Sequence, residues 1–148
     1  MDSFQINLQL PGKALNPNAR CHWGAKAKAS KEQREFARFL AEAELRSMRK
    51  ALGKDGVDFT REWELVYVRP VFYFKDARRR DRDNCSASLK AARDGICDAM
   101  KAYGYVDDDD IFVPLPPVIR KDKHLPRVEI TVSRDVDRDY LLGIEDSP

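Results

Sequence analysis

The spacing of hydrophobic residues changes along this chain between two periods, and that change constrains the fold more than any other feature. Residues 3–10 alternate between apolar and polar side chains, which is typical of a half-buried strand, and Pro11 ends the pattern. Residues 11–29 have no clear period, and we expect an ordered loop there. Residues 30–52 then repeat every 3.6 residues, as in an amphipathic helix. A chain that uses both periods is expected to combine helices and a sheet in one domain.

The start and end of this first helix are predicted by local signals. Ser30 with Gln33 three residues later fits a capping box at the N-terminus. Gly53 is a suitable stop after about Leu52. The apolar face predicted by the 3.6 spacing consists of Phe36, Phe39, Leu40, Ala43 and Ala51.

The middle of the chain predicts a strand and a second helix. After a turn region at residues 54–61, residues 63–75 are rich in Val, Tyr and Phe and predict one long strand or two short ones. Pro70 inside this run implies an edge position, a bulge or a break. A helix over residues 85–103 is expected to end at Gly104. Its apolar stripe is Leu89, Ala92, Ile96, Ala99, Met100 and Tyr103.

The last third of the chain predicts two more strands. Residues 111–119 form a strand-like run that three prolines interrupt, and residues 128–132 alternate as a final strand. Residues 134–148 are polar and acidic and are expected to form a loose tail. The resulting order β-α-β-α-β-β predicts an α/β (α+β) fold in a single domain, with a mixed sheet and two main helices.

Composition excludes several classes of protein. A length of 148 residues suits one domain, and 43% hydrophobic residues are enough for a core. No apolar run approaches the ~20 residues of a membrane span, so we expect a cytoplasmic protein without a membrane partner. The three widely spaced cysteines argue against a disulfide framework or a zinc site. The net charge of +2 is near neutral, but the charges are unevenly placed along the chain.

Two acidic motifs are the strongest chemical signal. Asp81 and Asp83 are two residues apart before a helix, and Asp107–Asp110 follow that helix. We expect a sheet to place the two segments side by side, where clustered carboxylates would bind Mg²⁺. Bound Mg²⁺ activates water and stabilises a phosphate under attack. The alternative is structural, with Asp83 or Asn84 capping the helix and the aspartate run forming a solvated turn.

Arginines surround the first acidic motif. Side chains of this kind attract and orient a polyanionic backbone, which suits a nucleic-acid substrate. The alternative is a solvated basic turn. The residues concerned are Arg78, Arg79, Arg80 and Arg82.

The segment from Arg80 to Asn84, followed by Lys90 and by the segment from Gly104 to Asp109, resembles the RusA-type Holliday junction resolvases, in particular a phage-like member. That family carries an RxDxDN segment, a helical lysine and a GxxxDD segment. The loop at residues 18–23 and the closing segment at residues 127–132 are also similar. The resemblance covers about residues 3–133, so it implies an endonuclease domain at residues 1–133 and a tail at residues 134–148.

The resemblance implies a homodimeric endodeoxyribonuclease that cuts four-way DNA junctions by paired nicks, uses Mg²⁺ with Mn²⁺ as a possible substitute, and needs no organic cofactor. Asp109 is the matching acid when Gly104 anchors the alignment, and the four-aspartate run leaves that register open by one residue. The implied catalytic residues are Asp81, Asp83, Asp109 and Lys90; the implied metal ligands are Asp81, Asp83, Asp108 and Asp109; and the DNA-binding residues are Arg78, Arg79, Arg80, Arg82, Asn18, Arg20 and His22.

Three points stay open in the sequence. Lys90 follows Asp83 by seven residues rather than four, and because both offsets return to one helical face we expect a lengthened helix that keeps its phase. His22 and Trp23 suit stacking on bases, although we expect Trp23 to dock the loop onto the core. The rival functions are a non-catalytic junction-binding module and a nuclease acting on flaps or replication forks.

Overall fold

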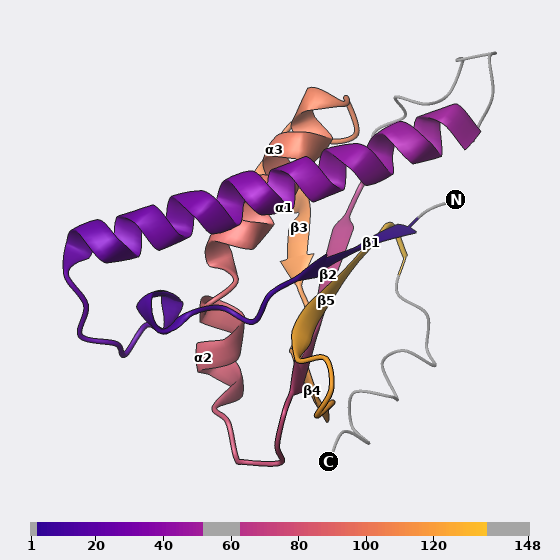
Figure 1. Cartoon of the computed structure of the whole chain (residues 1–148). Helices are drawn as coiled ribbons and strands as arrows, with labels where there is room; N and C mark the ends of the chain where they lie inside the picture. Colours follow the sequence, from indigo (N-terminus) through magenta and orange to yellow (C-terminus); the bar gives the residue numbers. More distant parts are fainter. Residues whose placement is uncertain (1–2, 52–62, 136–148) are drawn as a thin grey trace.

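The computed structural model describes residues 3–51 and 63–135 and shows a mixed α+β domain (Figure 1). The predicted turn at residues 54–61, the stop at Gly53 and nearly all of the predicted tail lie outside the described residues. The elements are β1 (Ser3–Leu8), η1 (Lys13–Leu15), α1 (Trp23–Ala51), β2 (Val66–Phe74), α2 (Arg82–Ala87), α3 (Lys90–Ala102), η2 (Asp109–Ile111), β3 (Phe112–Pro114), β4 (Val118–Lys121) and β5 (Arg127–Ser133).

The sheet is mixed, as predicted. Its order is β1-β5-β2-β3, and β4 also pairs with β2. β5 is antiparallel to both β1 and β2, whereas β3 and β4 run parallel to β2. The parallel strands are reached through a crossover that contains α2 and α3, as a parallel connection requires.

The alternating segments at the two ends of the domain form neighbouring strands. β1 pairs with β5 from Ser3↔Ser133 to Leu8↔Val128, and every second residue of each strand is buried. A period of two places those residues on one face of the sheet. The predictions of a first strand and of a final strand are therefore confirmed.

Pro70 lies in the central strand β2 and not at an edge. β3 pairs with β2 up to Val68↔Pro114, and β4 pairs with it from Val71↔Val118. Two residues of β2 thus face three residues of the proline-rich segment 115–117, which is the arrangement of a bulge. The proline is tolerated because regular pairing on that side is interrupted where its missing N–H would lie.

The first helix starts earlier than predicted. α1 begins at Trp23, so Ser30 lies inside the helix and no capping box forms there. Gln33 caps a different helix: its side-chain oxygen accepts a hydrogen bond of 3.0 Å from the amide of Ala92, and its nitrogen donates to the carbonyl of Ser88 at 3.1 Å. The predicted capping box is therefore wrong, and the Gln33 side chain instead caps the start of α3.

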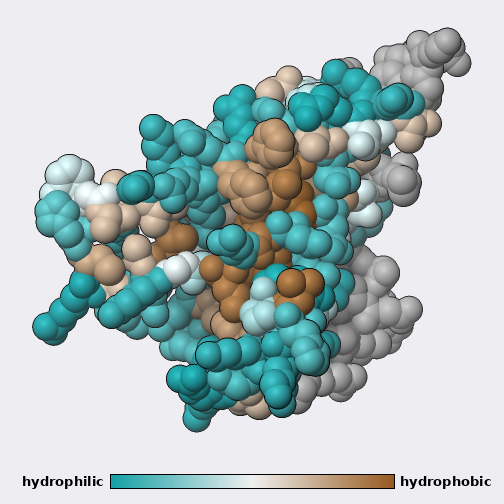
Figure 2. Space-filling model, in the orientation of Figure 1, coloured by the Kyte–Doolittle hydropathy of each residue, from teal (hydrophilic) through white to brown (hydrophobic). Residues whose placement is uncertain are grey.

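The predicted apolar face of this helix is mostly wrong. Phe36 and Phe39 are 49% and 61% exposed, although Leu40 of the predicted face packs against the core. Figure 2 shows a hydrophobic region crossing the face on which the middle of α1 lies, bordered by hydrophilic residues. The residues of α1 that are buried are Ala37, Ala41, Leu45 and Met48.

The predicted second helix is two helices. α2 and α3 are separated at Ser88 and Leu89, and Leu89 has non-helical backbone angles. The apolar stripe of the second part is confirmed, since five of its six members are buried. α3 ends as predicted at Gly104, whose φ of 79° suits glycine, and the amide of Tyr105 bonds the carbonyl of Met100 across the cap at 2.9 Å.

One hydrophobic core joins these elements. It contains the inward residues of β1, β2 and β5 together with those of α1 and α3, so both long helices cover the same face of the sheet. α1 and α3 pack closely because small residues line their contact, among them Gly95. No helix within residues 3–51 and 63–135 has the length and apolar character needed to cross a membrane.

Candidate nucleic-acid interface and acidic sites

A cleft of about 860 Å³ lies beyond the ends of β2 and β4, at the lower end of the sheet in Figure 1. We call it the basic cleft. One wall is the loop after β2 together with the start of α2, and the other is the end of β4, which the register Phe74↔Lys121 holds beside it. Six cationic side chains and two carboxylates line it: Arg78, Arg79, Arg80, Arg82, Arg120, Lys121, Asp76 and Asp81.

Two of these arginines are fixed by Asp76. Its carboxylate accepts hydrogen bonds from the amide and guanidinium of Arg78, at 3.1 and 3.2 Å, and forms an ion pair of 2.8 Å with Arg80. The bond from the Arg78 amide, with the bonds from both guanidinium groups, lowers the pKa of Asp76 to about 2. Arg80 also lies over the ring of Phe74, 4.0 Å from its centroid.

Three other cations of the cleft have side chains without an internal partner. Within the described part of the chain, the side chains of Arg79, Arg82 and Lys121 form no hydrogen bond or ion pair. Cations left this way on a concave surface are suited to an external anion. The four arginines that the sequence singled out thus line one cleft with Asp81, and their role in binding DNA stays a prediction.

Asp81 and Asp83 lie at the start of α2. Asp81 is the N-cap residue, and its carboxylate accepts a hydrogen bond of 3.1 Å from the amide of Asn84. Asp83 follows in the first turn and is exposed. The sequence allowed a capping role for Asp83 or Asn84, but Asp81 performs it. The second carboxylate oxygen of Asp81, which does not bond the amide of Asn84, is available for other contacts.

A second hollow of about 350 Å³ adjoins the basic cleft, and we call it the aromatic hollow. Phe72 and Phe74 form part of its lining, with ring centroids 5.7 Å apart in a stacked arrangement. Asn16 from the loop after η1 and Asn84 from α2 supply amide groups. Burial raises the pKa of the Cys85 thiol in the same lining, so the thiol stays neutral.

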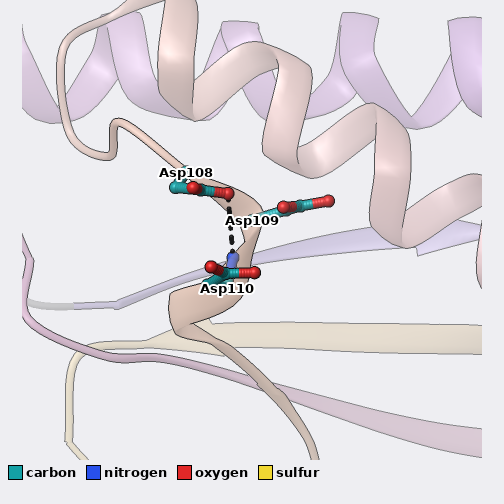
Figure 3. A group of neighbouring side chains, drawn as sticks. All are labelled: Asp108, Asp109 and Asp110. Atoms are coloured by element: carbon teal, nitrogen blue, oxygen red, sulfur yellow. Dashed lines mark hydrogen bonds between the residues drawn. The ribbon is translucent and has the colours of Figure 1, made fainter.

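The second acidic motif forms a compact triplet. Figure 3 shows Asp108, Asp109 and Asp110 around the short helix η2, with the amide of Asp110 donating to Asp108 at 3.2 Å. One carboxylate oxygen from each lies within 4.8 Å of the others, and all three residues are exposed. A hydrogen bond between the two side chains lowers the pKa of Asp108 and raises that of Asp109. Hard oxygen donors in this arrangement suit Mg²⁺.

The expectation that both acidic motifs lie side by side is wrong for a single chain. Asp109 precedes β3, whose first residue Phe112 pairs with Val66 at the beginning of β2, whereas Asp81 follows the end of β2. The nine residues of β2 separate the two motifs by roughly 25 Å at ~3.3 Å per residue. A parallel crossover has this consequence, because the end of one strand and the start of the next parallel strand lie at opposite ends of the strands.

Lys90 does not lie in the same helix as Asp83. It is the first residue of α3, and the break before α3 removes the helical phase that linked the two residues. Its ammonium group pairs with Asp94 one turn later, at 3.2 Å. The expected lengthened helix is therefore wrong, and helical register no longer places Lys90 beside Asp83.

The loop before α1 presents its residues to solvent. Asn18, Arg20 and His22 are exposed, and the His22 ring stacks with Trp23 at 5.8 Å between centroids. Trp23 is 77% exposed, so the expectation that it docks the loop onto the core is wrong. Stacking of this pair on bases remains a prediction.

Sequence reasoning missed Arg120, Lys121 and Asp76 as parts of the basic cleft. Residues 120–123 contain three basic side chains, but their place beside Arg79 depends on the pairing of β4 with β2, which no local pattern shows. The signal that could have linked them is that residues 76–82 and residues 120–123 each follow a strand-like run.

Comparison with known proteins identifies a relative of undescribed function. No protein-family model matches the sequence. Over 129 residues the chain is 34% identical to an uncharacterized protein of Xylella fastidiosa, and the match spans 86% of this chain and 74% of that protein. The chain belongs to the family of this protein. Membership carries no activity with it, so function has to be argued from the sites.

Proposed function

We propose that this protein is a Mg²⁺-dependent, structure-selective endodeoxyribonuclease that resolves four-way DNA junctions by paired symmetric nicks. The observation that carries the proposal is the basic cleft, in which Asp81 lies among cationic side chains from two separate segments. Such a cleft suits a phosphate backbone, and a carboxylate in it suits the metal chemistry of phosphodiester cleavage. The resemblance of the segments containing Asp81, Lys90 and Asp109 to RusA-type resolvases supports the same activity.

The residues divide the proposed work between them. Arg79 and Arg82, which have no partner among the described residues, bind the backbone, while Arg78 and Arg80 form the fixed wall held by Asp76. Asn18, Arg20 and His22 contact DNA beyond the cleft. Mg²⁺, or Mn²⁺ in its place, would supply an activated water and charge stabilisation when bound.

In this proposal the working unit is a homodimer. The set Asp81, Asp83 and Asp109 does not fit one ion within a single chain, because the sheet holds its members at opposite ends. A two-fold axis can bring Asp81 of one chain beside Asp109 of the other, and a junction with two-fold symmetry needs two matched sites. The exposed Phe36 and Phe39 on α1 offer apolar surface for such pairing.

The first experiment measures cleavage directly. Purified protein is incubated with a four-way junction, a replication fork and a linear duplex, each with Mg²⁺, with Mn²⁺ and with EDTA. We expect metal-dependent cutting of the four-way junction, lost in Asp81→Asn, Asp83→Asn and Asp109→Asn while junction binding persists. Equal cutting of linear duplex contradicts the resolvase assignment, and full activity in any variant removes that residue from the site.

The second experiment tests the shared site. Asp81→Asn and Asp109→Asn protomers are mixed and allowed to exchange before the assay. If each site takes Asp81 from one chain and Asp109 from the other, the mixed dimer contains one intact site and regains nicking of one strand. If each site lies within one chain, every site in the mixture lacks an acid and no activity returns.

A non-catalytic junction-binding module is the second candidate. The separation of the two acidic motifs favours it, since one chain alone does not bring Asp81 and Asp83 together with Asp109. It predicts binding of the four-way junction that is equal with and without Mg²⁺ and no cleavage under any condition. A flap or fork nuclease instead predicts metal-dependent cutting of the fork in preference to the four-way junction.

A further inference from the structure

We infer that the basic cleft and the aromatic hollow together form a binding site for a nucleotide whose base is unpaired, with its phosphates in the cleft and its base in the hollow. This inference rests on the nucleic-acid-binding part of the proposed function and deepens it by naming the feature of the substrate that is recognised. It does not depend on cleavage.

The two hollows share one rim. Arg79, Arg80 and Asp81 belong to the lining of both. A ligand that occupies both hollows therefore needs an anionic part and a flat, partly apolar part a short distance apart. A nucleotide has this composition, because its phosphate joins its base through one sugar.

The phosphate side is built for more than one anion. Its two walls come from segments about forty residues apart in sequence, the loop at residues 76–82 and the end of β4 at residues 119–121. Cations outnumber carboxylates in the lining by four, and Arg79, Arg82 and Lys121 have no partner within the described residues. A volume of about 860 Å³ accommodates successive phosphates of a strand rather than a single one.

The base side combines a stacking surface with amides. Phe72 is only 1% exposed and the guanidinium group of Arg80 lies over the Phe74 ring, so the plane of Arg80 is the surface on which a base can stack. Asn16 and Asn84 offer both donors and acceptors. Proteins bind unstacked bases with planar side chains, arginine included, together with groups that hydrogen-bond to base edges. A volume of about 350 Å³ limits the hollow to roughly one nucleoside.

Arg80 fixes the geometry between the two sides. Its guanidinium group donates to the carbonyl oxygens of Asp76 and Arg78, at 3.0 and 2.7 Å, and lies over the ring of Phe74. A side chain held by these contacts loses little entropy when a ligand binds against it. The rim is therefore preorganised, and the base and phosphate subsites keep a constant separation.

The inference predicts a preference for single strands over duplexes, which a surface that binds only phosphates would not show. A continuous duplex stacks its bases inside the helix, so only its phosphates reach the protein. A single strand, or a branch point with an unpaired nucleotide, fills both subsites. Binding of a single strand is thus expected to be stronger than binding of a duplex with equal phosphate contacts.

The base subsite is tested with two fluorescent single strands of equal length, one with normal bases and one made of abasic nucleotides, by anisotropy in EDTA. Wild-type protein is expected to bind the normal strand at least about fivefold more tightly, since stacking of a base on Arg80 above Phe74 is expected to be worth that much. Equal affinity for both strands overturns the inference.

A filling variant locates the subsite. Gly12 belongs to the lining of the aromatic hollow, and a Cβ atom there meets nothing within 4 Å, so Gly12→Leu narrows the hollow without strain. We expect this variant to bind both strands alike. Gln9→Leu adds the same side chain to an exposed position outside the lining and is expected to keep the preference. If Gly12→Leu keeps it too, or Gln9→Leu loses it, the base lies elsewhere. Asn16→Ala provides a second, smaller change in the hollow.

The phosphate subsite is tested by salt dependence. Replacing Lys121 or Arg79 by Gln is expected to reduce the slope of log affinity against log salt by about 0.7 each for single strands. Lys123→Gln removes an exposed cation two residues away from Lys121 and outside the cleft, and it is expected to leave the slope unchanged. Equal slopes for Lys121→Gln and Lys123→Gln would place the phosphates elsewhere. Because every measurement is made in EDTA, loss of the base preference and loss of Mg²⁺-dependent cutting are separate results.

Discussion

Gly95 of α3 lies directly against the backbone of α1 at Arg34. A Cβ atom on Gly95 would overlap the carbonyl oxygen of Arg34 and lie 3.0 Å from the amide nitrogen of Arg38. The neighbouring residues Ala37 and Ala41 of α1 are completely buried. Small side chains thus let the two helices approach closely over the sheet.

Gly95→Ala is expected to destabilise the protein by about 1–3 kcal/mol or more, because backbone atoms cannot move aside as a flexible side chain can. Chemical denaturation measures the change. Gly12→Ala is the matched control, since its new Cβ meets nothing and its φ of −70° suits alanine. A loss of stability in Gly12→Ala as large as that in Gly95→Ala would contradict the close approach.

The ion pair between Arg34 and Asp98 is expected to couple the same two helices weakly. The guanidinium donates two hydrogen bonds to the carboxylate, at 2.7 and 2.9 Å. This hydrogen bonding is the largest cause of the lowered pKa of Asp98. A double-mutant cycle with Arg34→Gln and Asp98→Asn should give a coupling of about 0.5–1 kcal/mol, since Arg34 is half exposed. The wider, more exposed pair Lys28–Glu32 should give less.

The pH dependence of that coupling has a definite sign. A carboxylate with a lowered pKa stabilises the fold above its unfolded pKa of about 4, and the contribution is lost as the pH falls through the folded value. The cycle repeated in acid should therefore show no coupling. A coupling that persists after Asp98 is protonated would contradict the ionic origin.

Gln33 is expected to stabilise the start of α3. Removing its side chain in Gln33→Ala leaves the buried amide of Ala92 without its partner and should cost about 1 kcal/mol. Hydrogen exchange at the amide of Ala92 should accelerate more than exchange elsewhere in α3. Ser30→Ala is the control: inside α1 it should change stability little, whereas a true N-cap would cost a similar amount.

The strands were predictable because their signal is local. Alternation over residues 3–10 and residues 128–132 requires one buried face whatever the partner strand is, and both segments form strands. The phase of α1 was not predictable in this way. The large side chains of Phe36 and Phe39 dominate its pattern, yet the close contact with α3 selects alanines, which contribute little to a hydrophobic period.

This difference in phase has a direct consequence for stability. Leu45 is completely buried, so Leu45→Ala is expected to cost about 2–5 kcal/mol. Phe39→Gln, at a position that is mostly exposed, should change the free energy of unfolding by no more than about 0.5 kcal/mol. Thermal and urea denaturation of both variants provide the measurement. A larger loss of stability in Phe39→Gln than in Leu45→Ala would instead support the apolar face that the sequence predicted.

The candidate sites were predictable in part. The cluster of arginines around Asp81 is contiguous in sequence, so its members meet in one cleft. Its second wall and the distance to Asp109 depend on which strands pair and in which direction. Neither is encoded in residues 78–84 or 107–110 themselves, because strand pairing is decided by the whole sheet.

Charge removal and Mg²⁺ are both expected to stabilise the acidic triplet at η2, but by different routes. The raised pKa of Asp109 and the lowered pKa of Asp108 come first from the hydrogen bond between them, which exists only while one of the two is protonated. As the pH rises through the folded pKa of Asp109, that bond is lost and the charges repel. Asp109→Asn keeps a neutral donor, so in EDTA at pH 7 its melting temperature should exceed that of the wild type.

Addition of Mg²⁺ should reverse this order. A cation held by the carboxylates of Asp108, Asp109 and Asp110 stabilises the wild type by binding the folded state, and the gain should shrink in Asp109→Asn. Asp107→Asn is the matched control, because Asp107 is exposed but outside the triplet, and it should keep the wild-type gain. Thermal melts across a Mg²⁺ titration measure all three proteins. Equal gains in Asp109→Asn and Asp107→Asn would show that the ion acts on overall charge and not at η2.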